Sequence, residues 1–355
     1  MEFVKQSEIC NTIGLLSQFK LRAVTYSIFF LGTSCFGASV IKDSLPRVKS
    51  YKNHFSFAPN FTRIDLNTTL VNQQTKSKIE YRTATATRLG LALDYRWIGV
   101  ELFTRLPFNE KKGKGTTNNS GVYFRINKSK FWANGIYQKF NGFYWNNPDQ
   151  INRSELSPGF FPLRPDMKST FLQVNAYYIF KPERFSNMAA QGENERQLRS
   201  GGTFFTGIGF YFDRLNSNDP IVPQSQILNF KGQERLNQIT ARSFALSGGY
   251  AHTFVIWKKL YTAFYFAPGL AIFSGSQRYL EGKTESLKGQ LTVRLDMRIS
   301  LGYNSDTYFG GLLLSNASNN QNLGIGTSYS NGFSTIRLFV GRRILLKKQL
   351  GFWDL

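Results

Sequence analysis

The segment "QLTVRLDMRISLGY" (residues 290–303) alternates between apolar and polar side chains at every position. Its odd-numbered residues are apolar or aromatic, whereas its even-numbered residues include Arg294, Asp296 and Arg298. Successive side chains of a β-strand point to opposite faces, so this pattern predicts a strand with one apolar and one charged face. The same alternation occurs in segments 88–95, 122–128, 170–180 and 204–213.

The polar positions of these segments distinguish between two kinds of sheet. A soluble antiparallel sheet can also have one wet face. Here, however, the polar face carries Gly, Ala, Asn, Arg, Asp and Tyr, a mixture that is typical of the crowded polar lumen of a transmembrane β-barrel. The pattern therefore favours lipid on one side of the sheet and a polar lumen on the other.

The connections between the predicted strands carry a second signal. Thirteen segments between residues 61 and 343 have the period of a strand, and five connections ("YR", "SK", "WK", "SD" and "NGF") have two or three residues. The connections between these are long and polar. Tight turns that alternate with long loops are typical of outer-membrane barrels, with turns in the periplasm. The connection 182–200 is long where a turn is expected, and Pro182 predicts a short periplasmic helix near its start.

An odd number of strands does not fit a bacterial single-chain barrel, which contains an even number. Either one of the thirteen segments is not a separate strand, or residues 346–355 supply a last one. We therefore expect an all-β fold, a transmembrane antiparallel up-and-down β-barrel of 12 or 14 strands over residues 61–355, with long extracellular loops and short periplasmic turns.

The amino terminus carries an export signal. Residues 23–38 form a compact apolar stretch preceded by Lys20 and Arg22, and this stretch is shorter than the ~20 apolar residues of a membrane-spanning helix. It ends in small residues, which predicts a cleaved signal peptide over residues 1–37. A periplasmic N-terminal arm over residues 38–60 would follow.

The two cysteines, Cys10 and Cys35, both fall within this predicted signal peptide. The sequence "LGTSC" leaves lipidation of Cys35 as an alternative to simple cleavage. With the signal peptide removed, the chain would contain no cysteine, which excludes disulfides, thiolate metal sites and a cysteine nucleophile.

The composition of the chain also indicates a class of binding partner. The mean hydropathy of −0.29 excludes an ordinary helical membrane protein. Aromatic residues make up 15% of the chain, which suits an aromatic β core or the aromatic girdles of a barrel. The net charge of +22 raises the question of nucleic acid, but no basic helix or Lys/Arg block occurs. Phosphates of lipopolysaccharide or anionic lipid are the predicted partners of this charge.

Histidine chemistry is limited, because the chain has two histidines. His54 precedes the first predicted strand. His252 shares a parity with apolar residues and is predicted near the lipid face beside Trp257, whereas Ser243 and Ser247 lie on the opposite parity. No Ser–His pair is evident, and no zinc-ligand spacing exists. We expect no catalytic residues, no metal and no cofactor.

The candidate functional residues are charged side chains on the predicted lumen face. Such charges either pair with one another and close a narrow lumen, or attract an anion, as in an anion-selective pore or a site for an acidic head group. Both interpretations remain open. The predicted network comprises Arg294, Asp296, Arg298, Arg125, Asp94, Glu101, Asp213 and Arg337.

Three stretches show a family resemblance: residues 165–210, residues 88–103 ("RLGLALDYRWIGVELF") and residues 137–145 ("YQKFNGFYW"). The longest contains "STFLQVNAYYIFKPERFSNMAAQGENERQLRSGGTFFTGIGF". The chain resembles a Bacteroidota family of predicted outer-membrane barrels that is described only as a domain of unknown function. The resemblance covers most of residues 60–343. It implies a barrel fold and an outer-membrane location, and it implies no activity, ligand or site residue.

Together these patterns predict a non-enzymatic barrel in the outer membrane of a Gram-negative cell, reached through a cleaved signal peptide. Its role would be structural, or the handling of small solutes or lipids in a charged lumen. One alternative is an outer-membrane lipid-modifying enzyme, and another is a secreted soluble β protein that binds acidic polymers. Expected partners are outer-membrane lipid, lipopolysaccharide phosphates, the barrel-assembly machinery and a small anionic solute, and not nucleic acid.

Overall fold

A computed structural model describes residues 46–84, 87–106, 112–324 and 326–347. The predicted signal peptide over residues 1–37 and the first residues of the predicted arm lie outside these ranges. The described residues form fifteen strands and three short helices. The strands are β1 (Val48–Ser50), β2 (His54–Asn72), β3 (Lys78–Arg82), β4 (Thr87–Tyr95), β5 (Ile98–Arg105), β6 (Asn118–Lys128), β7 (Phe131–Trp145), β8 (Leu163–Ile179), β9 (Glu195–Gln197), β10 (Gly201–Asn216), β11 (Leu236–Trp257), β12 (Leu260–Tyr279), β13 (Thr284–Asn304), β14 (Tyr308–Gly324) and β15 (Thr327–Leu345). The helices are α3 (Gln150–Ser154), α4 (Asn187–Ala190) and the 3₁₀ helix η3 (Gln224–Asn229).

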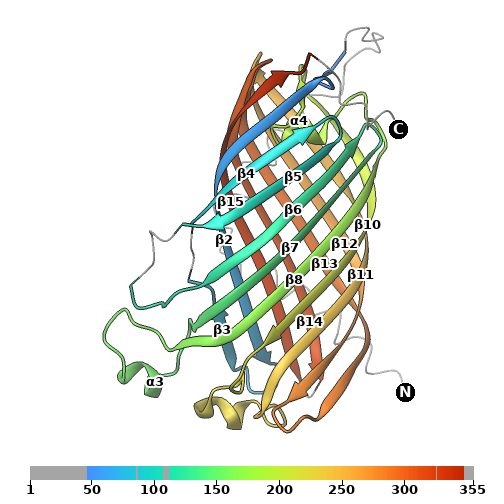
Figure 1. Ribbon diagram of the computed structural model, residues 1–355. Helices are drawn as coiled ribbons and strands as arrows, with labels where there is room; N and C mark the ends of the chain where they lie inside the picture. Colours follow the sequence, from blue (N-terminus) through green and yellow to red (C-terminus); the bar gives the residue numbers. More distant parts are fainter. Residues whose placement is uncertain (1–45, 85–86, 107–111, 325, 348–355) are drawn as a thin grey trace, which may run out of the picture. The chain divides into compact units, whose positions relative to one another are not determined.

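Twelve strands close into one antiparallel barrel (Figure 1). Each pairs with its neighbour along the chain, in the order β2, β4, β5, β6, β7, β8, β10, β11, β12, β13, β14 and β15, and β15 pairs with β2 to complete the ring. Closure pairs each strand of this ring on both sides over most of its length, as a wall surrounded by lipid requires. The expected antiparallel up-and-down barrel of 12 or 14 strands is confirmed, with twelve.

The two ends of the barrel differ in their connections. At one end, here called the turn end, residues 96–97, 129–130, 258–259 and 305–307 join the strands. At the other, here called the loop end, connections 106–117, 146–162 and 217–235 are long. The loop predicted between residues 273 and 288 is largely strand, because β12 continues to Tyr279 and β13 begins at Thr284.

β3 forms part of the wall at the loop end. β2 pairs with β4 over Phe55–Arg63 and with β3 over Asn67–Val71. β7 pairs with β6 as far as Asn141 and with β3 at Tyr144 and Trp145. β3 therefore fills the wall between β2 and β7 at the loop end, where β4, β5 and β6 have ended. The segment 78–94, which was predicted as one strand, is divided into β3 and β4.

The thirteenth predicted strand, residues 322–330, is not a separate strand. "NGF" at residues 331–333 has the composition of a turn, but Gly332 pairs with both Asn67 and Ser318 in the middle of the sheet. The chain reverses instead between β14 and β15, where Gly324 and Gly326 adopt positive φ angles of 82° and 69°. Segments 306–316, 322–330 and 334–343 thus form two strands, which gives an even number.

The alternation predicted from the sequence is confirmed in the wall. On β13, Leu291 is 72% exposed on the outer face, whereas Arg294 is 3% exposed inside. Ile208 on β10 and Phe244 on β11 are also exposed on the outer face, 65% and 68% respectively. The barrel therefore has an apolar outer belt around a polar lumen. Within the described ranges, no helix is long and apolar enough to cross a membrane.

The belt is interrupted on one side, towards the loop end. There the outward side chains of β2, β14 and β15 include Arg63, Asp65, Asn316 and Ser334, and Ser334 pairs with both Asp65 and Asn316. Such a polar area is costly to bury in hydrocarbon, so the belt ends there on β2, β14 and β15, whereas on β13 it continues through Val293 to Leu291.

We expect Ile208→Arg, at the outer face of β10, to lower the free energy of unfolding in phosphatidylcholine vesicles by about 2–4 kcal/mol, because it places a charge in hydrocarbon. Ser334→Arg, on the polar area, is the matched control and should cost about 1 kcal/mol or less. Urea titration measures both, and equal costs would contradict the assignment of the belt.

Candidate functional site

The connection between β8 and β10 folds into the lumen at the turn end. Its residues 186–197, here called the lumen insert, contain α4 and β9, and β9 pairs with β1. The Ser186 hydroxyl accepts a hydrogen bond from the Ala189 amide and so caps α4, which explains why the helix begins at Asn187 and not near Pro182. A short helix was predicted in this connection, but α4 is buried.

Side chains from well-separated strands hold the lumen insert. The Asn187 amide donates to Asn127 Oδ1 of β6 (3.1 Å), and the Ser300 hydroxyl of β13 donates to the Ala190 carbonyl (2.7 Å). The guanidinium of Arg343, on β15, donates to the Glu193 carbonyl (3.1 Å from Nε). Because these strands lie far apart around the ring, the insert occupies the lumen itself.

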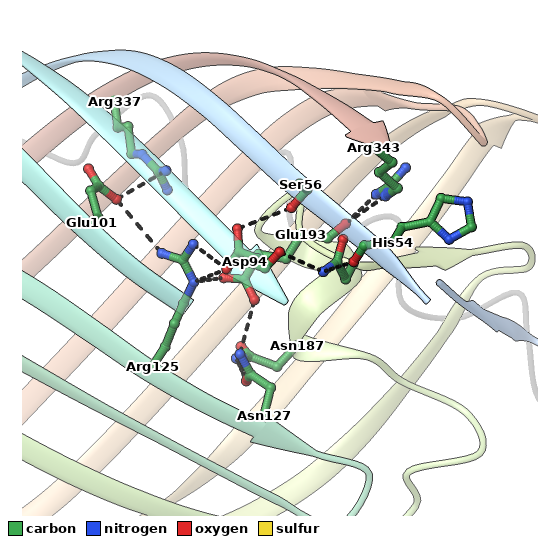
Figure 2. Close-up of polar contacts among 11 residues, drawn as sticks. His54, Ser56, Asp94, Glu101, Arg125, Asn127, Asn187, Glu193, Arg337 and Arg343 are labelled. Atoms are coloured by element: carbon green, nitrogen blue, oxygen red, sulfur yellow. Dashed lines mark hydrogen bonds and ion pairs between the residues drawn. The ribbon is translucent and has the colours of Figure 1, made fainter. Parts of the chain in front are cut away.

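A buried ion network joins the insert to the wall (Figure 2). Arg125 on β6 is 2% exposed, and its guanidinium lies 2.6 Å from Asp94 and 2.8 Å from Glu193 of the insert. Glu101 lies 3.8 Å from Arg125 and 3.1 Å from Arg337, so it extends the network to β15. Removing one member of a buried ion pair costs about 3–5 kcal/mol, because the partner charge stays desolvated.

Glu193 and Asp94 share one guanidinium in this network. Burial raises the pKa of Glu193 above the ordinary carboxyl range, and the neighbouring Asp94 carboxylate adds to the rise, although the Arg125 charge opposes it. The Asn127 amide donates to Glu193 Oε2 (3.0 Å). The attachment of the insert therefore depends on one titratable carboxyl group outside the strands.

The loop end of the lumen is filled by apolar side chains. Leu70 of β2, Leu215 of β10 and Ile221 and Phe230 of connection 217–235 have no exposed surface and belong to one packed cluster. The Tyr81 hydroxyl donates to the Ile221 carbonyl (2.6 Å), which fixes the connection over the opening. The lumen is thus closed by the insert at one end and by this cluster at the other.

A cavity of about 180 Å³ lies in the lumen between these two closures. Gln191 of the insert lines it, as do Phe171 and Phe333, which pack together at a ring distance of 4.2 Å next to the apolar cluster. The polar and charged residues whose side chains face it from the wall are Thr62, Arg88, Glu101, Asn134, Gln138, Gln173, Asn175, Asp296, Arg298, Ser315, Thr335 and Arg337.

Two arginines of this wall have no carboxylate within ion-pair distance among the described residues. Arg88 on β4 is 2% exposed, lies 3.9 Å above the Phe103 ring and donates to Asn119 Oδ1 (3.1 Å). Its Nε has no hydrogen-bond partner. Arg298 on β13 lies 5.1 Å from the Tyr265 ring. The cavity wall therefore carries unbalanced positive charge.

Gln138 on β7 is a second buried side chain of the cavity wall whose hydrogen bonds are incomplete. Its side chain is 1% exposed, and neither its amide nitrogen nor its amide oxygen has a hydrogen-bond partner among the described residues. Buried polar atoms are nearly always satisfied by protein or water. An acceptor atom of a molecule in the cavity would satisfy the amide nitrogen of Gln138.

The eight predicted lumen residues all face inward but form separate groups. Asp94, Glu101, Arg125 and Arg337 form the network described above. The remaining four do not join it: Arg294 pairs with Asp296 (3.1 Å), Asp213 accepts from Ser169 and Tyr329, and Arg298 lines the cavity. A single network of all eight is therefore corrected to one network of four plus local contacts.

Glu193, Arg88 and Gln138 were not among the functional residues predicted from the sequence. Arg88 shares a parity with Asp94 in the predicted strand 88–95, so its inward position was available in the pattern. Glu193 lies in a connection with no strand period, and no local signal places it in the lumen.

The two histidines lie outside the cavity wall. His54 contacts the Tyr51 ring at 5.4 Å between centroids, and His252, on the outer face of β11, lies 2.9 Å from the Tyr250 hydroxyl. The predicted position of His252 on the lipid-facing parity is confirmed.

We expect docking of the lumen insert to weaken as pH rises above the ordinary carboxyl range. The docked insert binds a proton at Glu193 that the undocked insert releases, so docking is strongest below both pKa values. Hydrogen exchange of residues 186–197, corrected for intrinsic rates, should show about tenfold less protection at pH 9 than at pH 6.

Glu193→Gln should remove most of this pH dependence, whereas Glu183→Gln, at an exposed position of the same connection, should retain it. Glu195, whose pKa burial also raises, accounts for the part that would remain. Protection that is equal at both pH values in the unsubstituted chain would contradict the role of Glu193.

Comparison with known proteins gives one family and several distant folds. The structure is similar to the outer membrane protease OmpT from Escherichia coli (8% identity, TM-score 0.39, 83% of this chain and 98% of that chain). It is also similar to the COG4313 outer membrane channel from Pseudomonas putida F1 (9%, 0.35, 87% and 100%) and to the P. putida toluene transporter TodX (8%, 0.28, 84% and 91%). Likenesses at this level support no inference about activity, and no curated protein matches the sequence.

The family comparison is specific. A sequence profile described as "Domain of unknown function (DUF4421)" matches residues 47–343, which includes the whole ring except the last residues of β15. The match agrees with the resemblance found in the sequence and covers well over half of the chain. The chain therefore belongs to the DUF4421 family.

Proposed function

We propose that this protein is an outer-membrane β-barrel that binds a small anionic molecule in its lumen, and that it neither catalyses a reaction nor forms an open pore. The observation that carries the proposal is the cavity of about 180 Å³ whose wall contains Arg88, a buried cation with no carboxylate partner among the described residues. An isolated buried charge costs several kcal/mol unless it is paired. An anion in the cavity would supply the missing partner.

The outer surface supports the membrane location. The strands present apolar side chains outward and polar ones inward, as transmembrane barrels do. A secreted soluble protein would have to leave this belt in water, and soluble monomers rarely expose apolar areas of that extent. Export through a cleaved signal peptide and contacts with lipopolysaccharide and the assembly machinery remain predictions of the sequence.

Closure of the lumen argues against a permanently open pore. The lumen insert and the apolar cluster around Phe230 stand at opposite ends of the cavity. Charges that line an open pore would be hydrated, whereas Arg125 and Glu193 are each 2% exposed. Straight entry of a bound molecule from either end of the barrel is therefore obstructed.

The enzymatic alternative has no comparable support. Hydrolysis or acyl transfer by a serine would need a base within hydrogen-bond reach of it, and neither His54 nor His252 lines the cavity. The groups that do line it are arginines, amides, hydroxyls and paired carboxylates, which suit binding better than proton transfer.

We expect Arg88→Gln to weaken binding of octanoate, a small carboxylate, by about tenfold or more, because a hydrogen bond to a charged group contributes about 1.5–3 kcal/mol. The same variant should be as stable as the unsubstituted barrel or more stable, since it removes an unpaired buried charge. Calorimetric titration in nanodiscs measures the affinity, with empty nanodiscs as the blank.

Arg342→Gln is the matched control, because Arg342 lies on the outer face of β15 over the Tyr308 ring. It should leave octanoate affinity unchanged. If octanoate does not bind the unsubstituted barrel, or binds the Arg88→Gln variant equally well, the anion site is refuted.

A further inference from the structure

The ladder between β13 and β14 is incomplete. Among the described residues it extends from Asn304 to Leu295 on β13 and stops where Leu295 pairs with Ser318. On its other side, β13 continues to pair with β12 as far as Thr284. β14 likewise remains paired with β15 to its end at Gly324. Residues 289–294 and 319–324 therefore face each other without a ladder, and they are here called the seam.

Side chains bridge the seam in place of backbone bonds. The Gln290 amide donates to the Asn322 carbonyl (3.0 Å) and accepts from the Asn322 amide (3.2 Å). The Thr292 hydroxyl donates to the Asn320 carbonyl (2.7 Å). Unpaired backbone groups are costly in lipid, so these bonds stabilise the wall. Unlike a ladder, however, they break by rotation of a side chain and leave both strands paired to their other neighbours.

The two rims of the seam differ on the outer face. Leu291 and Val293 on β13 are apolar and 72% and 59% exposed. Opposite them, β14 presents the exposed polar side chains of Asn320 and Asn322. A molecule that fits between these rims has one apolar and one polar part.

The inner side of the seam adjoins the cavity. The last paired rungs contribute Asp296 and Arg298 from β13, and Ser315 and Ala317 from β14, to the cavity wall. Asp296 is paired with Arg294, whereas Arg298 has no carboxylate within ion-pair distance among the described residues. The charged group nearest the seam that has no ion-pair partner among the described residues is thus the cation Arg298.

We propose that the seam is a lateral portal through which an amphiphile with an anionic head group passes from the surrounding lipid into the lumen cavity. This inference rests on the proposed anion site and adds the ligand class and its route. The head group pairs with Arg298 and then Arg88, and the hydrocarbon chain leaves along the apolar rim of Leu291 and Val293. Lateral passage also explains how a lumen closed at both ends is filled.

The test is to cross-link β13 to β14 across the seam. Residues 46–355 contain no cysteine, so Val293→Cys with Asn320→Cys, in a chain that also carries Cys10→Ser and Cys35→Ser, provides one reactive pair across the seam. A short bismaleimide links them. Leu301→Cys with Leu312→Cys is the matched control, because these residues are ladder partners on the outer face of the same two strands.

The probe is 2-bromododecanoate, whose bromine lies next to the carboxylate and quenches tryptophan fluorescence. Trp132 is buried against Tyr177 and Tyr265, which line the cavity, so it reports on a ligand there. Trp97→Phe, Trp145→Phe, Trp257→Phe and Trp353→Phe remove the other four tryptophans, so that Trp132 alone reports. The acid is delivered either dissolved in water or already present in the vesicle bilayer, and quenching is followed by stopped flow.

With delivery from the bilayer, we expect the seam cross-link to slow quenching by about tenfold and to leave its final extent unchanged. The ladder cross-link should leave the rate unchanged. Gln290→Leu with Thr292→Val, which removes the bridging bonds without a cross-link, should increase the rate. Heat-modifiable gel mobility verifies that each variant is folded.

Unchanged quenching rates in both the cross-linked seam and the loosened seam would overturn the portal and leave the anion site intact. A seam cross-link that slows uptake only from water would place the ligand source in the aqueous phase and also overturn the proposal. Absence of saturable quenching in every variant would refute the anion site and, with it, the portal.

Discussion

The arrangement of the lumen depends on one desolvated guanidinium. Arg125 is enclosed by Asp94 of β4, Glu101 of β5 and Glu193 of the lumen insert, so three separate parts of the chain meet at its charge. A buried cation without partners is far more costly than the pair is favourable. The insert closes this cluster and is also held by hydrogen bonds from Asn127, Ser300 and Arg343, and its position in turn sets one limit of the cavity.

The strand positions were predictable from sequence because the two-residue period is a local property. Each lumen-facing charge, from Asp94 to Arg337, was assigned to the correct face by its parity with apolar neighbours. The errors have equally local origins. Asn331 and Gly332 resemble a turn but lie within β15, where Asn331 faces the lumen and is buried. Pattern alone cannot distinguish a polar lumen residue from a turn residue of the same type.

The contacts that define the site are not local. Glu193 reaches Arg125 only because a connection of no regular period folds back through the barrel. Gln290 and Thr292 continue the alternation of β13 without a break, so nothing in that segment indicates that its ladder to β14 has ended. Which charges pair across the lumen likewise depends on the register of strands far apart in sequence, and this is why the eight predicted charges divided into separate groups.

Closure of the lumen at both ends is the central claim, and single-channel conductance tests it most directly. Four refolded barrels would be compared in planar bilayers: the full chain, one with residues 186–197 replaced by a Gly-Ser linker, one with residues 218–234 replaced likewise, and one with both replacements. We expect steady conductance from the doubly replaced barrel and none from the other three, because either closure suffices to block ions. Steady conductance of the full chain would show that the lumen is an open pore and would contradict the account.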